Sequence, residues 1–261
     1  YVDRTAPGAP GGLTSLPDGW TNQNAFTETW SNPADLSGIV GAYYKLGSSG
    51  PISPTDGTFV STTNTITNIA VPGEGRFNIF VWLVDAAGNV NHQNRNVELD
   101  AFWYDPTPPT TTVSLNGPLG GSGWYTGSVT ATFTVADLSS GPDVTYFRLD
   151  GGTWLTGTQA IVANEGQHTL DYYSTDIAGN QETTRTASIP IDTQPPTTTL
   201  QIGSAPGPDG WYTQSVTITF VVTDAGSGPD VTYFRLDGGT WLSGTQYILS
   251  AEGQHTLDYH S

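Results

Sequence analysis

The segment from Trp124 to Ser174 recurs from Trp211 to Ser261 at a constant offset of 87 residues, and 39 of these 51 aligned positions are identical. A shift that holds over this length without a gap indicates two tandem copies of one folding unit. After Ser174 the first copy continues as TDIAGNQETTRTASIPIDTQPP, and this stretch has no counterpart after Ser261. The sequence therefore predicts an array of modules whose last copy lacks its final strand.

Apolar and polar residues alternate with period two inside each copy. Between Val129 and Val135, valine, alanine and phenylalanine alternate with threonine, which is typical of a strand with one face on a core and the other in water. The run Asp150-Gly151-Gly152 predicts a hairpin turn, because glycine adopts positive φ at no steric cost. Regular short strands separated by turn signals indicate a β-sandwich. We predict an all-β chain.

Short linkers that contain proline mark the expected module boundaries, and each begins at an aspartate: Asp3, Asp105 or Asp192. Proline makes such linkers stiff. We predict three tandem Ig-like sandwiches. Residues 1–7 form the tail of a preceding module and a linker, 8–105 a divergent first module, 106–193 the second, and 194–261 a third that is incomplete at its C-terminal end.

The charge balance excludes some classes of partner. The chain has 24 acidic and seven basic residues, for a net charge of −17. Nucleic-acid binding needs clustered lysine and arginine for phosphate contacts, so we expect no nucleic-acid partner. The chain has no cysteine, which rules out disulfides and thiolate chemistry. No apolar run approaches the ~20 residues of a membrane-spanning helix.

Several features of the second module closely resemble the Ig-like repeat modules of bacterial cell-surface and secreted proteins. They include Asp137 with Ser140-Gly141, Trp154, Glu165-Gly166, and Asp176 with Ala178-Gly179-Asn180. The resemblance implies an Ig-like sandwich and an extracellular or cell-surface location. The third module departs from the pattern because it lacks the Asp-x-Ala-Gly-Asn turn. Such modules occur in adhesins, stalks and filaments, and as spacers beside secreted hydrolases, and fold alone does not choose among these roles.

Carboxylates are the obvious candidates for acid–base chemistry, but their repetition argues against it. Asp137, Asp150 and Asp171 recur as Asp224, Asp237 and Asp258. A catalytic pair duplicated in tandem is unusual, whereas turn-forming aspartates are expected in every copy. We predict no catalytic residues, no enzymatic activity and no required cofactor.

Calcium is the ligand that the acidic linkers suggest. Asp3, Asp105 and Asp192 lie where a metal could stiffen a module junction, and Ca²⁺ prefers oxygen ligands of this kind. No EF-hand loop is present in the sequence. The alternative is that these aspartates only form turns and end strands.

Two tryptophans are candidates for carbohydrate binding, because an indole face can stack on a sugar ring. Trp154 and Trp241 each follow a hairpin turn. The alternative, which we favour, is that each closes one end of a sandwich or packs at a module junction. Exposed, coplanar indoles would favour glycan binding. The threonine runs at 110–112 and 197–199 could carry O-linked glycans or simply lie in edge strands.

The unfinished third module leaves three explanations open. The sequence could be a window on a longer chain, a neighbouring subunit could donate the strand, or the end could be artificial or disordered. A sandwich without one strand exposes a sheet edge suited to strand addition. The expected partners are copies of the chain or further modules of the same chain, and glycans are a third candidate.

These observations predict a structural segment of a bacterial extracellular filament, stalk or adhesin. The near-identical modules, the acidic charge and the lack of a catalytic constellation motivate this hypothesis. The alternative is an accessory, carbohydrate-binding spacer region of a secreted enzyme.

Overall fold

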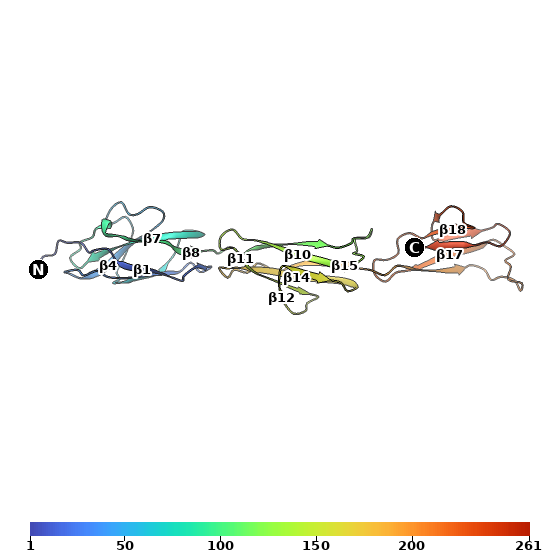
Figure 1. Cartoon of the computed structure of the whole chain (residues 1–261), viewed down its shortest axis with the longest axis horizontal. Helices are drawn as coiled ribbons and strands as arrows, with labels where there is room; N and C mark the ends of the chain where they lie inside the picture. Colours follow the sequence, from blue (N-terminus) through green and yellow to red (C-terminus); the bar gives the residue numbers. More distant parts are fainter.

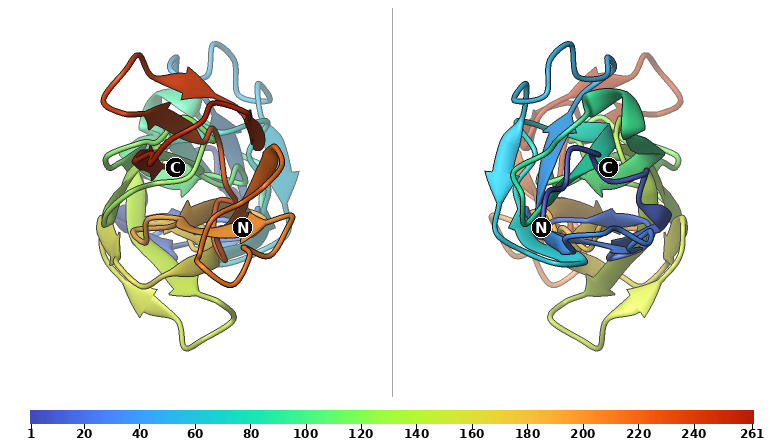
Figure 2. Two further views of the ribbon diagram at one scale, coloured as in Figure 1. Left: turned by 90° about the vertical axis from the view of Figure 1, so that its right-hand side faces the viewer. Right: turned by 90° about the vertical axis from the view of Figure 1, so that its left-hand side faces the viewer.

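The computed structural model describes all residues from 1 to 261. Strands account for 49% of the residues and helix for 1%, so the all-β prediction is confirmed. The strands form six sheets. The sheets enclose their cores in pairs, and Figure 1 shows these pairs following one another along a single long axis, with the N-terminus at one extreme. Seen along that axis, the sheets project onto one compact outline (Figure 2). No helix is long and apolar enough to cross a membrane.

The first two sheets enclose a core of 11 buried residues that includes Phe26, Trp30, Ile79 and Phe102. One sheet has the order β1 (Gly11–Leu16), β3 (Phe26–Ser31), β6 (Thr65–Ile69). The other has the order β2 (Trp20–Thr21), β8 (Asn96–Tyr104), β7 (Gly75–Asp85), β4 (Ile39–Leu46), β5 (Thr58–Val60). A single 3-10 turn, His92–Asn94, precedes β8.

The next two sheets enclose nine buried residues. One has the order β13 (Gln159–Val162), β10 (Val129–Ala136), β9 (Thr110–Asn116), and the other β12 (Leu155–Thr156), β11 (Pro142–Leu149), β14 (Gly166–Asp176), β15 (Arg185–Ile191). Val129, Ala131 and Phe133 are buried as their alternation predicts.

The hairpin predicted at Asp150-Gly151 is also present. Both residues have positive φ, 51° and 70°, and β12 pairs antiparallel with β11 after the turn. The backbone amide of Thr169 donates to Asp150 Oδ1 at 2.8 Å, which helps a non-glycine residue to hold this conformation.

The last two sheets repeat this arrangement with fewer strand residues. They have the orders β16 (Thr197–Ile202), β17 (Val216–Thr223), β20 (Gln246–Leu249), and β19 (Leu242–Ser243), β18 (Tyr233–Leu236), β21 (Leu257–His260). Their core has four buried residues: Val216, Ile218, Phe220 and Phe234. β21 covers the positions equivalent to residues 170–173 of β14. β14 pairs with β15 on its second edge, whereas β21 is an edge strand.

Candidate functional site at the linkers

Two of the three linker aspartates, Asp105 and Asp192, are buried, although each belongs to a proline-containing connection. Asp105 is 0% exposed and Asp192 is 6% exposed. Asp105 Oδ1 accepts a hydrogen bond from the Thr107 amide at 2.9 Å, and its Oδ2 accepts one from the Ser140 amide at 3.0 Å. The carboxylate therefore ties its own linker to the loop between β10 and β11.

The next linker repeats this arrangement. Asp192 accepts from the amides of Gln194 at 3.1 Å and Ser227 at 2.7 Å. Hydrogen bonds from Ser227 are the main reason why the pKa of Asp192 lies below its ordinary value. The two linkers thus make equivalent hydrogen bonds, at positions that correspond in the repeated sequence.

The Asp-x-Ala-Gly-Asn turn after β14 also binds the linker, through the side chain of its asparagine. Asn180 Nδ2 donates to the Asp105 carbonyl at 2.8 Å and to Asp176 Oδ2 at 2.7 Å. In the first module Asn89 Nδ2 donates to the Asp3 carbonyl at 3.3 Å and to Asp85 Oδ2 at 2.8 Å. This gives the turn a physical role, because its asparagine binds the backbone of the incoming linker.

Each of the first two linker aspartates belongs to a triad of carboxylates whose oxygens lie within 4.8 Å of one another. The triads are Asp3, Asp35 and Asp85, and Asp105, Asp137 and Asp176. The sequence predicted one metal ligand in each triad, Asp3 or Asp105, and did not predict the other two carboxylates of each triad. The recurrence of all three aspartates at equivalent positions was the signal that could have found them. Asp192 lies next to the corresponding loop of the third module, which contains Asp224.

No lysine, arginine or histidine forms an ion pair with any of the six aspartates in the two triads. Neither triad is therefore neutralised by a basic side chain. Carboxylates this close together repel one another when they are ionised. Backbone amides offset part of this repulsion, and that of Thr5 is the main cause that lowers the pKa of Asp3. The oxygen-only set suits Ca²⁺, and calcium binding here stays a prediction.

A glutamate from the preceding module completes each linker contact. Glu74 Oε2 accepts from the Thr107 hydroxyl at 2.7 Å, and its Oε1 accepts from the Ser139 hydroxyl. Glu165, in the equivalent loop, accepts from the amide of Thr193 at 3.2 Å and from its hydroxyl. These bonds join the module before the linker to the linker itself, and at Ser139 to the module after it.

Each of the two candidate ligand tryptophans lies beside an aromatic side chain of its own module, Trp154 beside Tyr173 of β14 and Trp241 beside His260 of β21. Trp154 is 37% exposed and Trp241 is 45% exposed. The guanidinium of Arg148 lies over the Trp154 ring at 4.6 Å, and that of Arg235 over Trp241 at 4.8 Å. The aromatic and cation–π contacts of each tryptophan lie within its own module, and the expectation that each closes one end of a sandwich or packs at a module junction stays a prediction.

Neighbouring side chains hold both indoles in place. Trp154 meets Tyr173 edge-on at 4.8 Å, and Trp241 meets His260 edge-on at 5.0 Å. Arg148 also pairs with Asp171 at 3.0 Å. Because a guanidinium covers one face of each indole, at most the opposite face is free to stack on a ligand.

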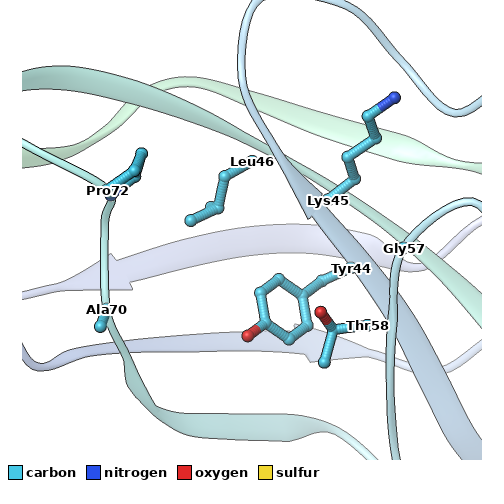
Figure 3. Close-up of a pocket in the computed structure, with 7 residues that line it drawn as sticks. All are labelled: Tyr44, Lys45, Leu46, Gly57, Thr58, Ala70 and Pro72. Carbon is cyan, nitrogen blue, oxygen red and sulfur yellow. The ribbon is translucent and has the colours of Figure 1, made fainter.

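A shallow hollow in the first module has a volume of about 370 Å³. Figure 3 shows its lining, which is formed by Tyr44, Lys45, Leu46, Gly57, Thr58, Ala70 and Pro72. Lys45 Nζ pairs with Asp56 at 3.0 Å, and no carboxylate or histidine lines the hollow. The hollow offers no acid–base pair.

Comparison with models of known protein families gives no match. No curated protein matches the sequence. Comparison with solved structures gives several matches, all with low TM-scores. The fibronectin(III)-like modules of CbhA from Clostridium thermocellum have 12% identity and a TM-score of 0.34, covering 69% of this chain and 94% of theirs.

Two further structures match over most of the chain. The FN1–FN3 domains of chicken CNTN1 have 11% identity and a TM-score of 0.29, covering 98% of this chain and 93% of that one. The central fibronectin-III array of RIM-binding protein has 12% identity and a TM-score of 0.26, with 95% and 90% coverage. The β-sandwich itself follows from the paired sheets and their cores described above.

Proposed function

We propose that this chain is a stiff structural segment of a bacterial extracellular filament, stalk or adhesin. The observation that carries the proposal is the burial of Asp105 and Asp192, the first residues of two linkers. Each linker is bonded to the module that follows it and, through Glu74 or Glu165, to the module that precedes it. Linkers fixed on both sides resist the hinge motion that is the default for tandem domains.

The end-to-end arrangement in Figure 1 suits such a role, because repeated modules then add length in one direction. The net charge of −17 keeps an extended surface soluble. The resemblance to modules of bacterial surface and secreted proteins supports the cell surface as the location. The partners in this proposal are further modules of the same chain or copies of it.

Two measurements test this proposal. Small-angle X-ray scattering should give a rod-like profile, and Asp105→Ala should shorten the maximum dimension by allowing bending. The matched control is Asp143→Ala, which removes the same charge at an exposed position. Antibody labelling of intact cells should detect the native protein without lysis. A compact profile, or labelling only after lysis, would contradict the proposal.

The alternative is an accessory carbohydrate-binding spacer of a secreted enzyme, and the half-exposed Trp154 and Trp241 are the observation in its favour. Binding to a panel of insoluble polysaccharides tests it directly. Retention of the chain, with loss of retention in the Trp154→Ala and Trp241→Ala double variant, would favour this function over the first.

A further inference from the structure

Two carboxyl groups from opposite sheets meet inside the first module. Glu28 of β3 is completely buried and lies opposite Ser15 of β1, whose hydroxyl donates to Glu28 Oε2 at 2.7 Å. Glu98 of β8 approaches the same carboxyl group from the other sheet, near enough for a hydrogen bond between the two side chains when one of them carries a proton. A polar cluster thus lies between the two sheets of this sandwich.

The sequence repeat gives an internal comparison for this cluster. In the second module, the strand pairing places apolar residues at the positions of Ser15, Glu28 and Glu98, namely Leu115, Ala131 and Ala187. Ala131 belongs to the core of that module, and the other two pack against it. The fold therefore needs no carboxyl group at either position, and the two glutamates are a special feature of the first module.

Each of the two glutamates has one carboxyl oxygen that is buried without a hydrogen-bond partner. These atoms are Glu28 Oε1 and Glu98 Oε2. Burying a polar atom without a partner is unfavourable, and native structures rarely do so. Because the two atoms belong to neighbouring carboxyl groups, a single missing partner between them would serve both.

No basic side chain of the module is that partner. Neither glutamate forms an ion pair with a lysine, arginine or histidine. The strands β1, β2, β5 and β6 contain no charged residue. The other charged residues of β4, β7 and β8 have partners of their own: Lys45 with Asp56, Arg76 with Asp100, and Asp85 with Asn89.

A proton fits this position better than a metal ion. Calcium takes about 6–8 oxygen ligands, whereas only two oxygens of the cluster lack a partner. A single proton satisfies both, because the protonated oxygen becomes a donor and the other oxygen remains an acceptor. Such a bond is also strong, since its acceptor is charged.

We propose that Glu28 and Glu98 form a proton-binding site, in which Glu28 Oε1 carries the proton and donates it in a hydrogen bond to Glu98 Oε2. Glu28 holds the proton because it is the more deeply buried of the two. The bond joins β3 in one sheet to β8 in the other, and β8 leads directly into the linker at Asp105. This proposal is independent of the stiffness of the linkers.

The site makes the first module sensitive to alkaline pH. Below the Glu28 pKa of about 7 the proton is bound and the two sheets are joined. Above it the hydrogen bond is lost and two like charges face each other in the core, which is unfavourable. The second module has alanines at both positions and should not respond in this way.

Carbon-13 NMR of the 261-residue chain with labelled glutamate tests the site, because only six glutamates contribute signals. In Glu98→Gln the amide donates to Glu28 Oε1 and the like charge is gone, so the pKa of Glu28 should fall by about one pH unit or more. In Glu98→Leu the charge is also gone but no donor replaces it, and the pKa of Glu28 should stay above its value in Glu98→Gln. Asp100→Asn removes a charge from the same strand and should leave the pKa of Glu28 unchanged.

Hydrogen–deuterium exchange, corrected for the intrinsic effect of pH, reports the loosening. From about pH 6 to about pH 9, residues 26–30 and 96–100 should lose protection in the parent and keep it in Glu98→Gln, while residues 129–133 change in neither. Three results would each overturn the proposal. They are a Glu28 pKa that Glu98→Gln leaves unchanged, equal pKa values in the Gln and Leu variants, and a pKa that falls steadily as calcium chloride is added, which would identify a cation as the missing partner.

Discussion

A buried carboxyl group in the first module gives a sharp prediction about pH. Glu28 on β3 is 0% exposed. Its Oε2 accepts from the Ser15 hydroxyl at 2.7 Å, and its Oε1 has no hydrogen-bond partner. Desolvation, with a smaller contribution from the charge of Glu98, raises the pKa of Glu28 from 4.5 to about 7.

The sign and size of the effect follow from linkage. A carboxyl group with a raised folded-state pKa is most favourable below its unfolded-state value of 4.5, where it is protonated in both states. Stability then falls as the pH rises from 4.5 to about 7, because over this range the unfolded state loses its proton while the buried group in the folded state keeps it, and the loss is complete above the folded-state value. At 1.36 kcal/mol per pKa unit, the loss is about 3 kcal/mol.

Glu28→Gln keeps the shape and removes the ionisation. The variant should resemble the parent at pH 4 and should be more stable above pH 8, by up to about 3 kcal/mol. Urea unfolding read by hydrogen exchange at residues 26–31 reports this module separately. The control Glu252→Gln removes an exposed charge and should change nothing at these residues. If Glu28→Gln loses stability between pH 5 and 8 as steeply as the parent, the argument from burial is wrong.

Three further predictions concern the linkers and the histidine pairs. Asp105→Ala leaves the buried amide of Ser140 and the partly buried amide of Thr107 without their acceptor and should cost about 1–3 kcal/mol, measured by denaturation against Asp143→Ala, which should be neutral. Calcium should raise the melting temperature by relieving repulsion in the two triads; an unchanged melt with and without chelator would exclude this. A hydrogen bond to Asp150 raises the pKa of His168, so the stability that this pair contributes is complete below 6.5 and is lost as pH rises through the raised value. NMR titration should show the pKa of His168 falling in Asp150→Asn, and an unchanged value would contradict the role of the pair.

The strands and the hairpin could be predicted because their signals are local. Alternation at Val129–Phe133 and the turn at Asp150-Gly151 depend only on neighbours in sequence. The same reasoning could have found the buried Glu28, since Phe26 and Trp30 flank it in period two. That alternation places the carboxyl group on the core face.

The linker site could not be assembled from the sequence because its members are distant. Asp105 and Asp176 are 71 positions apart and meet only because the loop after β10 and the turn after β14 lie at the same end of the sandwich. The stacking of Arg148 on Trp154 likewise depends on pairing across the hairpin. Repetition marked these residues, but only the fold shows that the asparagine of the turn holds the linker.

Stiffness of the junctions is the central claim, and a distance distribution tests it most directly. The chain has no cysteine, so Thr14→Cys and Thr134→Cys, both at exposed strand positions, give two unique spin-label sites in successive modules. Pulsed electron paramagnetic resonance should give one narrow distance distribution, which should broaden in the Asp105→Ala background. A broad distribution in the parent, unchanged by Asp105→Ala, would contradict a linker that is fixed on both sides.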